Sequence, residues 1–192
     1  MKREEVIVGI DEVGRGAWAG PLLMGAVVLG GPAPAGVTDS KLLSAARRRV
    51  LARQIKAAAT GIGLGWVPAG EIDELGLGPA LRLAAQRAVA ALDCPYDLII
   101  IDGTINFLPE YNVQTLAQAD LHVPAVAAAS IVAKVARDAY MHQLHRADPR
   151  FEFDRHVGYG TARHMAALRA YGPGPQHRRS VKPVGEVSRV HR

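Results

Sequence analysis

Short apolar runs alternate along the chain with longer segments in which apolar residues recur at helical spacing. The continuous runs at 6–10, 22–29 and 97–102 are rich in Val, Ile and Leu and have the length of buried strands. A fourth run at 61–68 ends in proline, which is typical of an edge strand. Gly, Pro or acidic residues bound these runs, so the pattern predicts four strands.

Over most of the remaining chain, apolar residues recur at the spacing of an α-helix. This spacing predicts helices at 41–60, 71–75, 79–92, 125–144 and 161–171, with Asp39 and Ser40 as the N-cap of the first. Three strands followed by alternating helix and strand indicate an α/β fold, a mixed sheet with helices packed on it. No internal repeat or linker divides the chain, so we expect a single domain over residues 1–192.

Composition places the chain among globular proteins. It has 192 residues, of which 49% are hydrophobic and 21% charged, and a chain of this size can bury a hydrophobic core without disulfides. Cys94 is the only cysteine, so no intrachain disulfide can form, which fits a reducing compartment. The longest apolar segment, 123–133, is far shorter than the roughly 20 residues of a membrane span. We therefore expect a cytoplasmic protein.

Positive charge is concentrated near the C-terminus. Residues 1–138 carry 13 Lys and Arg against 14 Asp and Glu, whereas residues 139–192 carry 10 against 4. This asymmetry is compatible with a solvated basic surface or with a polyanionic partner. We expect residues of about 140–192 to form a basic helical region that contributes to substrate binding.

Four carboxylates lie where a sequence that only builds a core would not place them. Asp11 and Glu12 end the predicted strand at 6–10, Asp102 ends the one at 97–102, and Asp138 lies within an Ala- and Val-rich helix. Clustered carboxylates repel one another unless a cation neutralises them, and oxygen ligands suit Mg²⁺ and Mn²⁺. The set predicts a two-metal site, which could hydrolyse a phosphodiester.

Each acid alone is also compatible with a strand-end cap or a surface residue. Adjacent strand residues point to opposite faces, so Asp11 and Glu12 should converge only if the strand breaks or bulges there. Ser130, Lys134 and Asp138 follow one another at intervals of four residues, so they lie on one face of the helix as a polar stripe. That stripe must face either water or a polar site.

Six ordered motifs resemble those of the type 2 ribonuclease H family, RNase HII. They span about residues 6–183 in the order of the family, which makes the resemblance specific. The motifs are Gly9-Ile-Asp-Glu-Val-Gly-Arg-Gly16 with Ala19-Gly20-Pro21, Asp39-Ser40-Lys41, Asp102-Gly103, the segment from Ala127 to Asp138, Gly158-Tyr159-Gly160-Thr161, and His177-Arg178-Arg179-Ser180.

The resemblance implies an RNase H-like fold, a five-stranded mixed sheet flanked by helices, with a helical C-terminal extension. It implies an endonuclease of ribonucleotide excision repair and DNA replication. Such an enzyme cuts the RNA strand of RNA–DNA hybrids and single ribonucleotides embedded in duplex DNA, leaving 5′-phosphate and 3′-hydroxyl ends. The implied residues are Asp11, Glu12, Asp102 and Asp138 as catalytic metal ligands for Mg²⁺ or Mn²⁺, and Gly14, Arg15, Gly16, Tyr159, Lys41 and Lys134 for substrate binding.

Those assignments agree with the chemistry of the residues. Only the 2′-hydroxyl distinguishes RNA from DNA at one position, and Gly14 and Gly16 allow the backbone to approach the sugar. Arg15 can clamp a phosphate with its planar fork. Tyr159, between two glycines, could stack on the sugar beside an RNA–DNA junction. Lys41 and Lys134 are candidate phosphate contacts, and Lys134 could instead pair with a carboxylate.

The chain departs from the family pattern at three positions. Ala119 precedes Asp120 where the family usually has Gly-Asp, Val157 replaces a basic residue, and Val181 replaces an aromatic residue. The segment 186–192 lacks a sliding-clamp motif with paired aromatics, so we expect no clamp tether. We also expect a monomer.

Three alternatives share some of these features: RNase HIII, another metal-dependent nuclease or recombinase of this fold, and a hybrid-binding module without catalysis. RNase HIII lacks the glycine–arginine–glycine stretch and carries an extra N-terminal domain. Another nuclease of the fold would share the acids but not the 2′-hydroxyl reader. A binding module would gain nothing from clustered negative charge.

Overall fold

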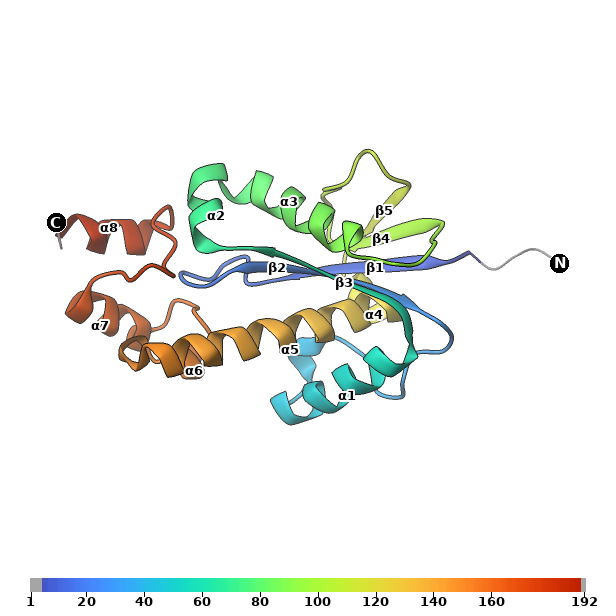
Figure 1. Ribbon diagram of the computed structural model, residues 1–192, viewed down its shortest axis with the longest axis horizontal. Helices are drawn as coiled ribbons and strands as arrows, with labels where there is room; N and C mark the ends of the chain where they lie inside the picture. The colour runs from blue at the N-terminus through green and yellow to red at the C-terminus, as the bar shows by residue number, and fades with distance from the viewer. Residues whose placement is uncertain (1–4, 191–192) are drawn as a thin grey trace.

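A twisted mixed sheet forms the centre of the computed structural model, which describes residues 5–190 (Figure 1). The strands are ordered β3-β2-β1-β4-β5. Their bounds are Ile7–Val13 (β1), Leu22–Leu29 (β2), Ala59–Val67 (β3), Leu98–Asp102 (β4) and Val113–Leu116 (β5). The three strands β1 to β3 are antiparallel, whereas β4 runs parallel to both β1 and β5. The expected five-stranded mixed sheet is confirmed.

Helices cover both faces of the sheet. Helices α2 (Ala69–Leu75) and α3 (Leu77–Ala90) lie on one face, and α1 (Ala45–Ala58) and the long α5 (Pro124–Ala147) lie on the other (Figure 1). The larger core lies between α3 and the sheet, with Ile10, Leu22, Ile99 and Ile101 fully buried. A second core joins α1 and α5 to the opposite face. Burial of these side chains, worth about 1.5–3 kcal/mol each, holds the layers together.

Small residues allow α5 to approach the strands that carry the acids. The helix contributes five buried alanines to the interface: Ala125, Ala127, Ala128, Ala129 and Ala133. Opposite them lies Gly9 of β1, where an added Cβ would be only 2.1 Å from the backbone of Ala125. The close contact places the polar side chains of α5 near the end of β1.

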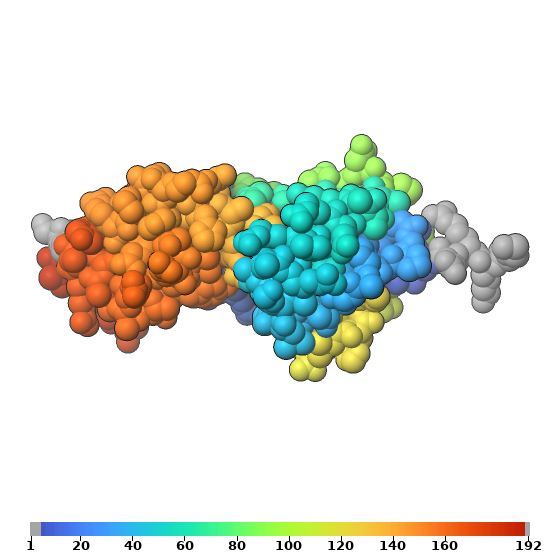
Figure 2. Space-filling view, turned by 90° about the horizontal axis from the view of Figure 1, so that it is seen from below, coloured from blue at the N-terminus to red at the C-terminus, as the bar shows by residue number. Residues whose placement is uncertain are grey.

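The C-terminal helices form one end of the molecule (Figure 2). Helices α6 (Phe153–His156), α7 (Ala162–Tyr171) and α8 (Lys182–Val190) follow the end of α5. Phe151 and Phe153 are buried there against Met141 of α5. Across residues 5–190, none of the helices combines the length and the apolar character that crossing a bilayer would need.

The N-cap predicted for the first long helix is wrong. Asp39 caps a short 3₁₀ helix, Ser40–Leu42, by accepting a hydrogen bond from the Lys41 N–H at 2.9 Å. Leu43 is extended, with φ −103° and ψ 143°, and interrupts the helix. The α-helix then begins at Ala45, with Ser44 as its N-cap. Hydrophobic spacing continues through this break, so the pattern predicted one longer helix.

The remaining boundaries differ from the predicted ones by only a few residues. The sequence pattern did not locate strand β5 or the four-residue helix α4 (Ala119–His122). Both are too short to show a period.

Candidate active site

A cavity of about 260 Å³ opens where β1 and β4 stop pairing. The parallel register ends at Ile10 and Ile101, so Asp11 and Asp102 follow directly on paired residues. Beyond this point β1 continues beside β2 alone. The cavity is lined by Asp11, Glu12, Val13, Gly14, Arg15, Gly16, Ser40, Lys41, Asp102, Ser130, Lys134 and Tyr159.

Asp11 is the most buried acid of the cavity, with 7% of its surface exposed. Burial, with a smaller contribution from the neighbouring charges of Glu12 and Asp102, raises its pKa to about 7. Two hydrogen bonds act in the opposite direction, one from the Ser130 hydroxyl and one from the Glu12 N–H at 2.8 Å. Ser130 also bonds Ser40 at 2.8 Å, which ties the 3₁₀ helix to α5 beside the acid.

Glu12 reaches the same cavity without the expected bulge. Strand β1 stays in continuous register with β2 from Val8 to Val13. Because β4 has ended, the edge of β1 is open there, and both Asp11 and Glu12 line the space beside it. Burial raises the pKa of Glu12 and so does the charge of Asp102, whereas Arg15 at 3.6 Å opposes that rise.

Asp102 connects the cavity to an acid that the sequence reasoning did not select. Its Oδ1 accepts a hydrogen bond from the Ala119 N–H at 2.7 Å, which fixes the start of α4. Asp120, which follows Ala119 in α4, is buried, with 7% of its surface exposed. Burial raises the pKa of Asp120, and the charge of Asp102 contributes further. One sequence signal pointed to this acid: Asp120 occupies the Asp of the family's usual Gly-Asp pair.

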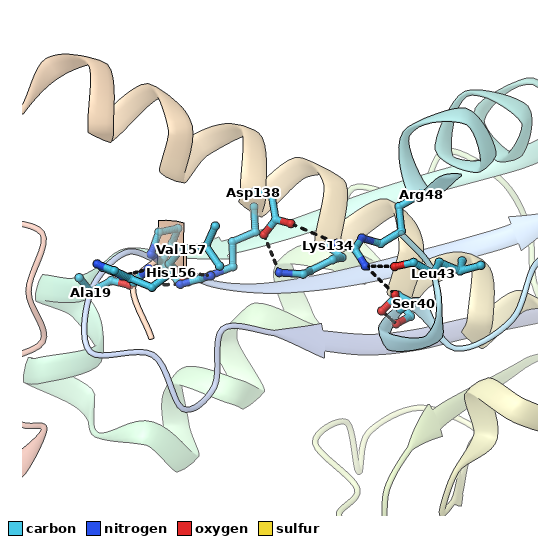
Figure 3. A network of polar contacts seen from close by, with 12 residues as sticks. Ala19, Ser40, Leu43, Arg48, Lys134, Asp138, His156 and Val157 are labelled. Carbon is cyan, nitrogen blue, oxygen red and sulfur yellow. Dashed lines mark hydrogen bonds and ion pairs between the residues drawn. The ribbon is translucent and has the colours of Figure 1, made fainter. Parts of the chain in front are cut away.

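Asp138 is not among the residues that line the cavity, although the sequence predicted that all four acids converge. Asp138 instead accepts a hydrogen bond from Lys134 at 2.6 Å and lies 4.0 Å from Arg48 (Figure 3). The predicted stripe exists, but eight helical residues span about 12 Å. Only its first two members, Ser130 and Lys134, therefore line the cavity.

Lys41 lies among the carboxylates. Burial lowers its pKa, but Asp39, Asp11, Asp120 and Asp102 together outweigh burial, and the pKa is raised overall. Arg48 holds the 3₁₀ helix that carries Lys41, since its Nη1 donates to the carbonyls of Ser40 and Leu43 (Figure 3). The Lys41 ammonium group therefore interacts electrostatically with four carboxylates.

The predicted substrate-binding residues share this cavity. Gly14, Arg15 and Gly16 form a turn directly after β1, and Tyr159 lines the cavity from the turn before α7. Arg15 and Gly16 are exposed, whereas Tyr159 is half-buried. A phosphodiester entering the cavity would meet backbone groups, a guanidinium and an aromatic ring beside the acids.

The donor set suits a hard divalent cation. Carboxylate oxygens are the preferred ligands of Mg²⁺ and Mn²⁺. Burial disfavours the charged forms of Asp11, Glu12 and Asp120, and the charges of neighbouring acids raise their pKa values further. Among residues 5–190, no three Asp, Glu, His or Cys side chains are already arranged as a ligand group. Asp11 and Asp102 accept local hydrogen bonds and Glu12 lies 3.6 Å from Arg15, so a cation would have to draw these acids together.

Comparison with known proteins places these residues in a family. The family model for Ribonuclease HII matches residues 8–184. The Ribonuclease HII of Bordetella avium (strain 197N) is 46% identical over 184 residues, which is 94% of this chain and 90% of that protein.

Two solved structures share the fold. The ribonuclease H2 of Pyrococcus horikoshii OT3 superposes with a TM-score of 0.78 at 24% identity, covering 96% of this chain and 98% of that one. Bst-RNase HIII in complex with Mn²⁺ superposes with a TM-score of 0.76 at 22% identity, covering 97% and 70%. The match at 46% identity and the family model agree, and the chain belongs to the ribonuclease HII family.

Proposed function

We propose that this chain is an endonuclease that hydrolyses the RNA strand of RNA–DNA hybrids. We further propose that it cuts at ribonucleotides embedded in duplex DNA and leaves 5′-phosphate and 3′-hydroxyl ends. Membership of the ribonuclease HII family supports the reaction class. The observation that carries the proposal is the cavity in which three carboxylates face a glycine–arginine–glycine turn and a tyrosine.

Asp11, Glu12, Asp102 and Asp120 are the residues that would hold the divalent cations, either Mg²⁺ or Mn²⁺. Bound cations supply Lewis-acid stabilisation of the phosphodiester and lower the pKa of a water nucleophile. The Mn²⁺ complex of Bst-RNase HIII supports a divalent cation for this fold. We assign Asp138 a different role, which is to hold Lys134 beside the cavity.

The other cavity residues bind and orient the substrate. Gly14 and Gly16 expose backbone groups that can approach a 2′-hydroxyl, the one feature that separates RNA from DNA at that position. Arg15, Lys41 and Lys134 bring positive charge to the phosphates. Tyr159 offers a ring to the sugar beside the RNA–DNA junction. The basic region of about 140–192 extends the positive surface for the duplex, with a net charge of +6 over residues 139–192.

The competing functions are less well supported. In a hybrid-binding module without catalysis, the buried acids would repel the phosphates and weaken the binding of the hybrid. Another nuclease of this fold would not need the 14–16 turn. The related fold is also found in a PCNA:RNase HII complex from Archaeoglobus fulgidus, but the sequence reasoning identified no clamp motif here. We therefore propose that the chain acts on nucleic acid without a clamp tether.

The test uses a DNA duplex that carries one ribonucleotide, incubated with Mg²⁺, Mn²⁺ or EDTA. We expect cleavage 5′ to or at the ribonucleotide with either metal and none with EDTA. Asp11→Asn should abolish cleavage while duplex affinity, measured by fluorescence anisotropy, stays within about threefold, because the side chain keeps its shape. Cleavage by Asp11→Asn at the wild-type rate would refute the site.

A further inference from the structure

Two turns that lie far apart in the sequence meet at the cavity. The 14–16 turn follows β1, and the 157–160 turn precedes α7. The N–H groups of Trp18 and Ala19 both donate to the Gly158 carbonyl, at 2.8 and 3.2 Å. Ala19 and Val157 lie together at one end of the polar network in Figure 3. The backbone therefore joins the two segments that carry the proposed substrate contacts.

The side chain of Arg137, from α5, stabilises the contact between these two segments. It has 0% exposure, and its three hydrogen bonds all reach backbone carbonyls. Nε donates to Pro21 at 2.9 Å, Nη1 to Val157 at 2.8 Å, and Nη2 to Ala19 at 3.1 Å. Its guanidinium also lies over the Tyr159 ring, 5.4 Å from the centroid. One rigid group thus contacts both segments and the ring itself.

The 14–16 turn rests directly on that guanidinium. A Cβ added to Gly14 would lie 2.2 Å from the Arg137 Nε, so only glycine leaves room. The other turn is held in a demanding conformation, since Val157 has φ +42° although its side chain is β-branched. A strained residue of this kind persists when its surroundings fix it, and here the Val157 carbonyl is held by Arg137.

Arg178 repeats the arrangement from the C-terminal segment. It has 1% exposure, and it donates from Nε to the Gly20 carbonyl at 3.0 Å and from Nη1 to the Arg15 carbonyl at 3.1 Å. Its own N–H donates to the Trp18 carbonyl at 2.8 Å. Within the described chain, its buried Nη2 has no hydrogen-bond partner.

Burial of two neighbouring cations is unfavourable compared with an apolar side chain of the same volume. Repulsion between the two groups adds to burial and lowers the pKa of Arg178 to about 10. An apolar pair could fill this space but could not fix carbonyl positions. The planar fork of arginine does so, because its donors have set directions.

We propose that Arg137 and Arg178 are positioning residues that align the 14–16 turn with Tyr159, and that this alignment determines how well a single embedded ribonucleotide is cut relative to a long hybrid. The inference rests on the proposed function. A single ribonucleotide offers one 2′-hydroxyl and one junction, so both turns must meet the same nucleotide. A long hybrid offers many registers, which tolerate a displaced turn.

The experiment measures kcat and KM for Arg137→Lys and Arg178→Lys on two substrates, a duplex with one ribonucleotide and a long hybrid. Lysine keeps the charge but lacks the fork. We expect the ratio of kcat/KM for the single ribonucleotide to that for the hybrid to fall about tenfold, since small misplacements can cost up to about 100-fold. Leu51→Ala, which opens a cavity in the second core, is the matched control for lost stability and should leave the ratio unchanged.

Arg137→Lys is also combined with Tyr159→Ala. If Arg137 acts through the ring, the ratio should fall much less when lysine is introduced into the Tyr159→Ala chain than into the wild type. Circular dichroism selects folded variants, and Arg178→Lys carries the test alone if Arg137→Lys does not fold. An unchanged ratio in a folded arginine variant, or full additivity with Tyr159→Ala, would overturn the proposal. Failure of the wild type to cut either substrate would instead refute the proposed function.

Discussion

Asp120→Asn and Asp138→Asn form a matched pair that decides which acid completes the site. Both substitutions remove one negative charge and keep the side-chain size. Asp120 is buried beside Asp102, whereas Asp138 is bound to Lys134 outside the cavity. We expect opposite effects on activity and stability from the same chemical change.

The magnitudes follow from the surroundings of each acid. Loss of a group that merely supports a metal ligand costs about 10–100-fold, so loss of a direct ligand at Asp120 should cost at least about 100-fold in kcat/KM, or ~2.7 kcal/mol. The pKa of Asp120 is raised, which means that its charge destabilises the fold, and Asp120→Asn should not lower the thermal midpoint. Asp138→Asn removes a helical ion pair with Lys134, worth about 0.3–1 kcal/mol, and should lower the midpoint by a few degrees while changing kcat/KM less than tenfold.

The assay uses initial rates on a duplex with one ribonucleotide at saturating Mg²⁺. Mn²⁺ binding without nucleic acid, measured by calorimetry, separates loss of the metal from loss of chemistry. We expect weaker Mn²⁺ binding for Asp120→Asn and unchanged binding for Asp138→Asn. A loss of about 100-fold in activity and Mn²⁺ affinity in Asp138→Asn, with both kept in Asp120→Asn, would refute the assignment of Asp120 as the ligand.

Three further outcomes are expected. Tyr159→Ala should reduce cutting of a single embedded ribonucleotide more than cutting of a long hybrid, and equal losses on the two substrates in steady-state assays would count against junction sensing. Burial lowers the pKa of His164 and of His177 to about 4, so the unfolded chain binds more protons than the folded chain between about pH 6.5 and 4. The free energy of unfolding should therefore fall as the pH drops through that window, by about 1.4 kcal/mol per pH unit for each proton. Urea denaturation measures this, and a free energy of unfolding that does not change with pH would contradict it. Gly9→Ala should destabilise the fold by about 1–3 kcal/mol, because its Cβ would meet the backbone of Ala125 at 2.1 Å, and an unchanged denaturation midpoint would show that α5 can shift without cost.

The sequence was sufficient to predict the end of β4, a short apolar run that ends in Asp102. It did not predict the end of β1, because that strand continues through Asp11 and Glu12 to Val13. The adjacency of Asp11 and Asp102 needed the parallel pairing of β1 with β4, which local pattern does not specify. The reach of Glu12 into the same cavity also depends on tertiary structure, since it follows from the early end of β4.

Asp120 and Asp138 illustrate the limit of periodicity. Asp138 stood out because its helix is long and its polar stripe is regular, but the stripe extends past the cavity. Asp120 did not stand out because α4 has only four residues and follows Gln118 in a left-handed conformation, so no repeat surrounds it. The hydrogen bond from the Ala119 N–H to Asp102 places this helix, and that contact spans 17 residues of sequence.

Acids occur at this point of the sheet because pairing ends there. Up to Ile10 and Ile101 the strands are enclosed by both helical layers, and a carboxylate would be buried without compensation. One residue later the edge opens, but α5 is still close enough to exclude much of the water from Asp11. Burial, and then repulsion from neighbouring acids, raises the pKa values of Asp11 and Glu12, and the charges of Lys41 and Arg15 offset this only in part. A bound cation would remove that repulsion, so metal binding and stability of the fold are coupled through the same few side chains.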